Sequence, residues 1–378
     1  MKQQPEIKVC KLSCHFLRYS LIWPDENEEF NPSKRFYIKQ LLFIVFFAIP
    51  NWLVLFSHLL LSLQEGTVDV SEDFAIFTAF FSYVGMMTMY VVKQKELASL
   101  LLDMSDFRTF SKPPLFDTMN KKLGYFVTFI FYYAVNATLI YNGVKIINIP
   151  KCRRERKIGE VCGTLTPVWT PFDTDHWLTL VLVMLYIFGF YVTVDRGIMF
   201  VALQSFEIAC NIKLRIDQLN SMLLSCFEGN FEADRKRLNR CIQYHNLIIS
   251  YSERVNGCFI NEMFTFLATG GIIFGCLENQ ILKQLDLGAM LHIAGWIESV
   301  FLACLSGQIM IDASTSIAEA AYNSRWYDAD PNLRKELILM IMRSQKPLFL
   351  ETGPFNVLSF SLFVSIMKLS YSILAVLR

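Results

Sequence analysis

Long apolar stretches alternate with polar connections along the whole chain. About 20 apolar residues in a helix cross the hydrocarbon core of a bilayer, and roughly 17 to 25 are tolerated. Seven stretches meet this requirement, and most charged residues lie between them. They are Leu41–Leu63, Phe74–Val92, Leu123–Ile147, Trp177–Val194, Cys258–Ile281, Leu287–Ile311 and Phe355–Leu377. The pattern predicts an all-α membrane protein with seven transmembrane helices.

The connection between the fourth and fifth stretches, residues 204–257, has a helical periodicity of its own. Apolar residues recur every three or four positions on both sides of Gly229-Asn230, a pair typical of a turn. We therefore expect two helices that extend the membrane helices into the cytosol. With a third helix over Asn332–Ser344 they would form a stem for subunit contact. The alternative is that they are surface helices of one subunit.

These patterns divide the chain into four parts. Residues 1–40 form an N-terminal segment, and residues 41–311 hold six membrane helices, a ligand pocket and the connection 204–257. Residues 312–353 form an anchor helix region, and residues 354–378 form the seventh membrane helix. Lys346-Pro347 and Gly353-Pro354 mark the breaks before the last part, because proline lacks a backbone donor and clashes with the preceding helical turn.

Composition supports the assignment to a membrane. Hydrophobic residues make up 53% of the chain and charged residues 18%, more apolar surface than a soluble domain usually covers. The formal net charge is +1, and no block of Lys and Arg is long enough to suggest a nucleic-acid partner.

Basic residues indicate the orientation in the membrane. The N-terminal tail and the second, fourth and sixth connections carry seven, six, seven and five of them, whereas the first and fifth carry none and one. The positive-inside rule then predicts a cytoplasmic N-terminus and an extracellular C-terminus. The third connection is an exception with five basic residues between positions 151 and 157, and the other connections outweigh it. This orientation is opposite to that of a G-protein-coupled receptor.

The residues that usually carry chemistry form few patterns. Of ten cysteines, only Cys152 and Cys162 share a predicted extracellular loop, and they are candidates for a disulfide. Cys10 and Cys14 lack the second ligand pair of a zinc site, and the five histidines are scattered. The sequence shows no phosphate-binding glycine loop and no nucleophile elbow. We expect neither enzymatic activity nor a metal or other cofactor.

Aromatic and apolar side chains with few polar ones line the outer halves of four membrane stretches. Walls of this kind suit a small apolar ligand, although ordinary helix packing explains any one of them equally well. The candidate ligand-binding residues are Phe77, Phe80, Phe81, Tyr83, Tyr133, Asn136, Ile140, Val181, Met184, Leu185, Phe188, His292, Trp296 and Ser299.

The segment from residue 318 onward carries three motifs in a fixed order. They are AAYNSRWY at 320–327, RSQKPL at 343–348 and KLSYS at 368–372, the last within the final apolar stretch. This segment, about a sixth of the chain, closely resembles the C-terminal signature of insect odorant receptors. The resemblance implies an odorant pocket among the second, third, fourth and sixth helices, in the outer half of the membrane.

The same resemblance implies a channel. Four subunits would each contribute the final helix to a central pore, closed by an apolar ring near its extracellular end. The implied pore and gate residues are Ser359, Ile366, Ser370, Leu374 and Leu377, and the implied subunit interface contains Tyr322, Trp326, Tyr327 and Pro347. The short fourth connection resembles that of a ligand-tuning subunit, which pairs with a shared odorant co-receptor in a heterotetramer.

The implied function is therefore detection of small volatile odorants by a non-selective cation channel. Its place would be the plasma membrane of an olfactory neuron's dendrite, in contact with membrane lipid. A gustatory receptor-type channel subunit, a seven-helix metabotropic chemoreceptor and a carrier remain alternatives.

Overall fold

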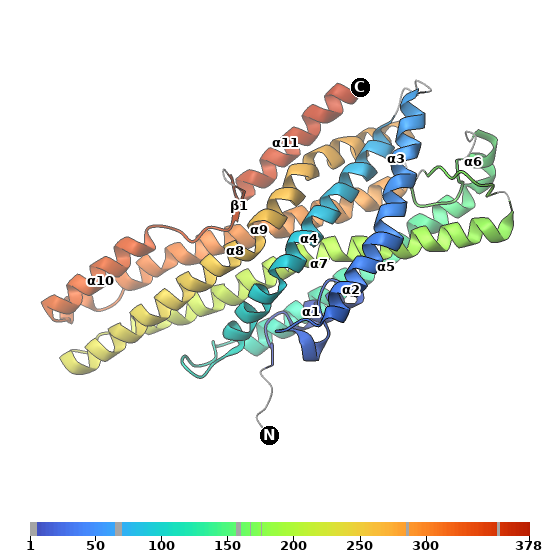
Figure 1. Ribbon diagram of the computed structural model, residues 1–378. Helices are drawn as coiled ribbons and strands as arrows, with labels where there is room; N and C mark the ends of the chain where they lie inside the picture. Colours follow the sequence, from blue (N-terminus) through green and yellow to red (C-terminus); the bar gives the residue numbers. More distant parts are fainter. Residues whose placement is uncertain are drawn as a thin grey trace.

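The computed structural model describes residues 6–64, 70–155, 160–166, 168–174, 176–284, 287–353 and 356–378. It is mainly helical, and seven of its helices are long and apolar enough to cross a membrane (Figure 1). The first crossing runs over Lys34–Gln64 and the others are α4 (Ser71–Ser105), α5 (Phe116–Ile147), α7 (Trp177–Leu224), α8 (Phe231–Gln284), α9 (Leu287–Tyr322) and α11 (Phe360–Leu377). The all-α, seven-helix prediction is confirmed. Pro354, Phe355, Arg156 and Lys157 lie outside the described residues.

The first crossing combines three helical pieces. α2 (Lys34–Phe43) passes through a short π-helical segment, Ile44–Ala48, into α3 (Ile49–Gln64). Pro50 is the second residue of α3 and cannot donate a hydrogen bond to the turn before it. A proline at this place accounts for the wider turn, because π-bulges relieve such a conflict without ending the helix.

The helices α7 and α8 continue well beyond the length that a bilayer needs. They have 48 and 54 residues, and their joined ends lie beside α10 (Pro331–Ser344) at one end of the molecule (Figure 1). We call this projecting group, the far parts of α7, α8 and α9 with α10, the stem. The Asp330 side chain accepts a hydrogen bond from the backbone amide of Asn332, and Pro331 occupies the first helical turn. The predicted helical extensions and the helix at Asn332–Ser344 are present.

The N-terminal segment is a packed element of the fold. α1 (Lys11–Tyr19) lies against α5 and α7, and the ring of Phe16 stacks on that of Phe131 with 4.3 Å between centroids. The buried hydroxyl of Ser13 donates to the carboxylate of Glu207 on α7. The polar composition of this segment did not indicate that it enters the helix bundle.

Two glycines of α8 decide which face of α11 is buried. A Cβ at Gly271 would come within 2.8 Å of Leu369, and one at Gly275 within 2.9 Å of the Ser370 carbonyl oxygen. Such small residues let two helices approach closely in a membrane. The hydroxyl of Ser370 donates to Glu278 of α8 at 2.8 Å, and this contact fixes the rotation of α11 further.

This packing places two of the predicted pore residues away from the open face of α11. Ile366 is 5% exposed and Ser370 is fully buried, both against the rest of the same chain. Leu374 and Leu377 are half-buried, and Ser359 caps the N-terminus of α11 by accepting from the amide of Leu362. The face that remains uncovered carries Ser361, Val364, Ser365, Lys368, Tyr371 and Ser372.

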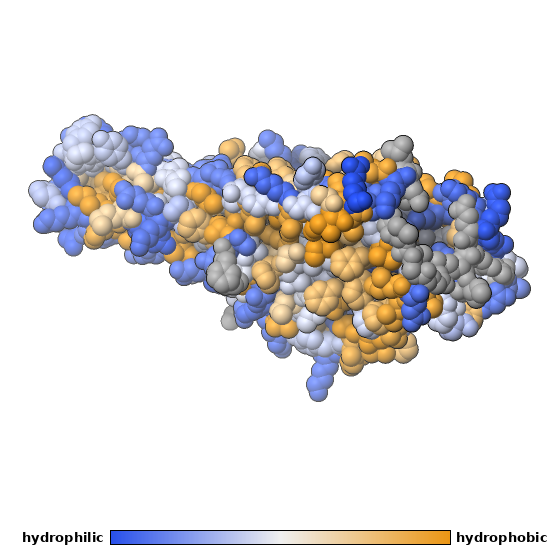
Figure 2. Space-filling model, turned by 90° about the horizontal axis from the view of Figure 1, so that it is seen from above, coloured by the Kyte–Doolittle hydropathy of each residue, from blue (hydrophilic) through white to orange (hydrophobic). Residues whose placement is uncertain are grey.

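A short hairpin and a disulfide complete the fold. β1 (Glu351–Thr352) pairs antiparallel with β2 (Asn356–Val357) directly before α11. Cys152, in α6 (Ile149–Glu155), is bonded to Cys162, as predicted. On the face shown in Figure 2, apolar residues cover the middle of the molecule, and hydrophilic residues gather at the end of the stem. This distribution is the one that a bilayer around the middle of the helices requires.

Candidate ligand pocket

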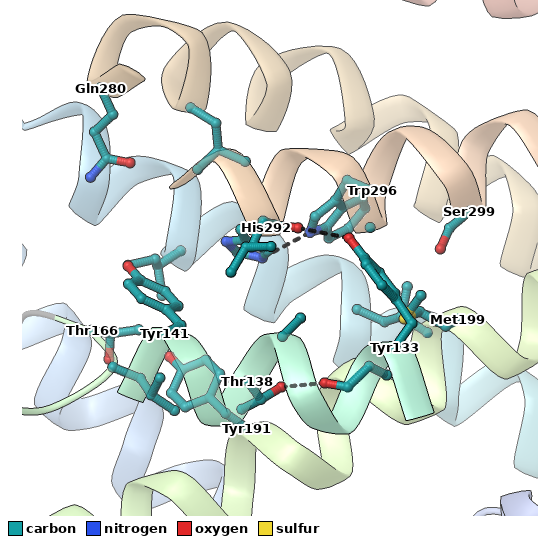
Figure 3. A pocket seen from close by; sticks show the side chains of 18 of the residues that line it. Tyr133, Thr138, Tyr141, Thr166, Tyr191, Met199, Gln280, His292, Trp296 and Ser299 are labelled. Carbon is teal, nitrogen blue, oxygen red and sulfur yellow. Dashed lines mark hydrogen bonds between the residues drawn. The ribbon is translucent and has the colours of Figure 1, made fainter. Parts of the chain in front are cut away.

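A partly open cavity lies within the helix bundle, between α5 and α9, with about 850 Å³ of empty space counted out to its mouth. α4, α7 and α8 and the loop at residues 165–166 complete its walls, so that side chains far apart in the sequence meet there (Figure 3). The lining contains Ile76, Tyr133, Thr138, Tyr141, Tyr191, Met199, Leu277, His292, Trp296 and Ser299. A largely apolar and aromatic wall with a few polar atoms is the usual form of a small-molecule site.

One face of α5 forms the floor of the cavity. Tyr133, Ala137 and Tyr141 follow each other at intervals of four residues and therefore lie above one another on the helix. The hydroxyl of Thr138 donates to the carbonyl oxygen of Ala134 at 2.8 Å within the same helix (Figure 3). The small side chains of Ala134 and Ala137 leave room for the cavity between the rings of Tyr133 and Tyr141.

α9 supplies the polar atoms of the opposite wall. Trp296 Nε1 donates to Nε2 of His292 at 3.0 Å, which places the histidine proton on Nδ1 in the neutral ring (Figure 3). The hydroxyl of Tyr133 donates to the carbonyl oxygen of Leu291 at 3.2 Å and links α5 to α9. The indole of Trp296 also stacks on Phe266, with 5.2 Å between centroids, so its orientation is held on two sides.

A charged pair and a loop border one end of the cavity. Lys145 of α5 pairs with Glu72 of α4 at 3.1 Å, and its ammonium lies 5.3 Å from the centroid of the Tyr141 ring. Leu165 and Thr166 reach the cavity from the loop that follows the Cys152–Cys162 disulfide. The loop is held by that disulfide and by the bond from the Thr164 hydroxyl to the Thr166 carbonyl oxygen at 2.8 Å.

Four of the fourteen predicted ligand-binding residues line this cavity: Tyr133, His292, Trp296 and Ser299. The structure places the others elsewhere. Phe77 lies near the rings of Trp52 and Phe56, while Phe80 and Tyr83 pack against Phe190. Met184 and Phe188 are half-buried, and the residues on the outer surface of the bundle are Phe81, Asn136, Ile140, Val181 and Leu185.

Sequence reasoning missed several lining residues for identifiable reasons. On α5 it selected Asn136 and Ile140, but the face turned inward is one position further along, at Ala137 and Tyr141. The polar character of Asn136 was misleading, because its amide donates to the Tyr132 carbonyl oxygen on the same helix at 2.8 Å. On α7 the lining begins at Tyr191, deeper than the predicted residues, and no feature of the sequence indicated that depth.

The fold and this cavity define a class: a seven-helix membrane protein with a small-molecule pocket inside its helix bundle. The family model described as 7tm Odorant receptor matches residues 67–371. The chain therefore belongs to the odorant receptor family of insects, a family of receptors rather than enzymes.

Individual relatives agree with this assignment. Odorant receptor 85b of Drosophila melanogaster is 30% identical over 176 residues, which are 45% of this chain and 45% of that protein. Odorant receptor Or2 of Anopheles gambiae is 26% identical over 147 residues, 37% of this chain and 38% of that one. These alignments span less than half the length of the relatives.

The fold is also that of a solved receptor. The olfactory receptor OR5 of Machilis hrabei matches 97% of this chain and 96% of its own with a TM-score of 0.76 at 16% identity. Its structure in complex with eugenol matches equally widely, with a TM-score of 0.78. Because the sequence identity is only 16%, this comparison shows that the two proteins share a fold and nothing more.

Proposed function

We propose that this chain is the odorant-binding subunit of a heteromeric, ligand-gated, non-selective cation channel that detects small volatile molecules. The observation that carries the proposal is the partly open pocket between α5 and α9, with its largely apolar and aromatic wall, in a chain of the odorant receptor family. Most of the pocket wall is apolar, as is usual for a site that binds a small organic molecule.

The cavity suits a ligand with one polar group on an apolar skeleton. Tyr133, Thr138 and His292 place hydroxyl and imidazole groups on two sides, while Ile76, Leu277 and Met199 provide apolar contact. The receptor of M. hrabei was solved with eugenol, and we propose a ligand of similar chemical character here. Burial of apolar ligand surface would supply most of the binding free energy.

We propose that the N-terminus lies in the cytoplasm and the C-terminus outside the cell, in the plasma membrane of an olfactory neuron's dendrite. The distribution of Lys and Arg supports this orientation. The disulfide between Cys152 and Cys162 supports it independently, because disulfides persist on the oxidising side of a membrane. α6, which carries Cys152, lies toward the same end of the molecule as the C-terminus (Figure 1).

We propose α11 as the pore helix, in the uncovered orientation described above. Its free face holds hydroxyls at Ser361, Ser365 and Ser372 and a charge at Lys368, whereas the opposite face packs on α8. A polar helix face without a partner inside the subunit suits a water-filled path between subunits. The half-buried Leu374 and Leu377 remain candidates for the apolar gate near the end of α11.

The stem is the proposed site of contact with the shared odorant co-receptor. Tyr322 and Tyr327 are 66% and 58% exposed, and α10 adds the exposed apolar side chains of Ile338, Leu339 and Met342. Contiguous apolar side chains on a region outside the membrane mark a protein contact. Trp326 and Pro347 are half-buried beside this surface, which leaves them a supporting role in the interface. The membrane part would contact lipid.

Currents from cells that express this chain with and without the co-receptor, challenged with an odorant panel, test the proposal. We expect odorant-evoked cation current only when both subunits are present, and we expect it to persist in an excised patch without GTP. Loss of the current when GTP is washed out would indicate a metabotropic receptor instead.

A further inference from the structure

A second cavity, open to solvent on one side, lies beside the stem. Its wall combines the loop between α4 and α5 with one side of α7 and of α8, and includes Phe107, Phe110, Arg215, Tyr244, Ser250 and Tyr251. On α4 it begins at Asp103, whereas the odorant cavity begins at Glu72. The intervening helix measures about 45 Å at 1.5 Å per residue, so the two cavities are separate sites.

Arg215 places an incompletely paired cation in this wall. Its side chain is 3% exposed, and its Nη2 donates to the Met104 carbonyl oxygen at the end of α4. The guanidinium also interacts with the hydroxyl of Tyr244, but its Nε has no hydrogen-bond partner among the described residues. The rings of Phe107 and Tyr251 lie 5.5 and 5.7 Å from the guanidinium carbon. A buried charge in this state is costly unless an anion completes it.

The nearby carboxylates already have other partners. Asp103 pairs with Arg254 at 2.6 Å. Asp106 pairs with Arg108 at 2.6 Å, and the hydrogen bond from the Arg108 side chain lowers the pKa of that carboxyl to about 2. Further cations stand at the rim: the ammonium of Lys8 lies 5.8 Å from the Phe107 ring, and the guanidinium of Arg240 5.8 Å from that of Phe110. The charge around the cavity is therefore positive.

We propose that this cavity binds a phosphate monoester, with Arg215 as the anchoring cation. The guanidinium matches phosphate geometry and would gain the acceptor that its Nε lacks. The stacked rings of Phe110 and Tyr244, 4.3 Å apart, form a flat wall for the rest of the molecule. The phosphate belongs either to a soluble small molecule or to a lipid headgroup. When bound, it connects the loop after α4 to α7 and α8, the two long helices of the stem.

The test uses the full-length chain in phosphatidylcholine nanodiscs and two probes. Inositol trisphosphate is the soluble source, followed by titration calorimetry. Phosphatidylinositol bisphosphate, mixed into the nanodiscs, is the lipid source, followed by the rise in thermal unfolding midpoint. Ser250→Glu puts a carboxylate at an exposed position of the cavity wall. Asn246→Glu, one turn earlier on α8 and also exposed, lies outside the wall and is the matched control.

We expect at least one probe to bind, with Ser250→Glu weakening it about tenfold or more, the effect of one opposed charge at close range. Asn246→Glu should weaken binding clearly less, because its side chain lies outside the cavity wall. Arg215→Gln should abolish binding if the variant folds. If it does not fold, the comparison of Ser250→Glu with Asn246→Glu tests the proposed site on its own. Binding by one probe alone identifies the phosphate source. Absence of binding by both, or equal effects of the two glutamates, overturns the proposal. No odorant response enters the measurement.

Discussion

Cysteine substitution at Ser370 and at Ser372 separates the two faces of α11. Ser370 is fully buried against α8, whereas Ser372, about half a turn further, is exposed. A water-soluble thiol reagent should modify Ser372→Cys in the assembled channel and reduce its current. Ser370→Cys should react slowly, because its side chain faces Glu278 and the rest of its own subunit.

The expected difference between the two reaction rates follows from the movement of α11 that a reagent needs to reach position 370. Access to position 370 requires α11 to separate from α8, and this also exposes Ile366, now 5% accessible. Exposing one buried aliphatic side chain to water costs about 1.5 to 3 kcal/mol. Since about 1.4 kcal/mol is a factor of ten, the reaction at position 370 should be about ten to a hundred times slower than at position 372.

The assay measures the rate at which the odorant-evoked current falls during application of the reagent. Background reaction should be low, because the eight free cysteines of the described residues are all buried. Burial also raises the pKa of the Cys10 and Cys14 thiols, which leaves little of the reactive thiolate. Equal rates at the two positions would refute the packing of α11 described here. Absence of reaction at position 372 would refute the proposal that its uncovered face lines the pore.

Three further predictions concern the pocket, the packing and the topology. Trp296→Ala removes a wall held by His292 and Phe266, and since such truncations cost about 3 to 5 kcal/mol in packed sites, odorant sensitivity should fall at least tenfold. Ile140→Ala, on the outer surface, should change it little, and equal effects on dose–response curves would contradict the pocket. Gly275→Val forces a side chain into α11 and should lower the unfolding midpoint of the purified receptor by several degrees, at a cost of about 1 to 3 kcal/mol. Gly257→Ala meets nothing within 4 Å and should lower it little, so matching losses would argue against the contact. On intact cells an antibody should stain a C-terminal tag and not an N-terminal one, and the reverse pattern would exclude the proposed orientation.

The seven helices could be predicted from the sequence because a bilayer imposes one simple length requirement. Each apolar stretch had to satisfy its own backbone hydrogen bonds, whatever its neighbours were. The same argument cannot place α1, whose Ser13 and Phe16 find partners only after α5 and α7 have assembled. The rotation of α11 likewise depends on two glycines of another helix, nearly a hundred residues earlier.

The pocket was predicted in part for a similar reason. Tyr133, His292 and Trp296 were found because aromatic and polar side chains in a membrane helix attract attention on their own. Ala137 leaves room in the cavity because its side chain is small, and Leu165 covers part of the cavity from the loop. Both contributions depend on the residues across the cavity from them. Tertiary packing fixes which face of each helix turns inward. The periodicity of a sequence therefore narrows the residues that face the cavity to a few neighbouring positions, but it does not identify them.

The uninterrupted course of α8 has a mechanical consequence. Leu277 borders the odorant cavity and Tyr244 the cavity beside the stem, and one helix of 54 residues without a proline carries both. When it moves as one body, such a helix acts as a lever. The distance between the two residues is about 50 Å, so a tilt of about 5° at one of them displaces the other by about 4 Å. A small adjustment around a ligand is thus enlarged at the far end without any part of the chain unfolding.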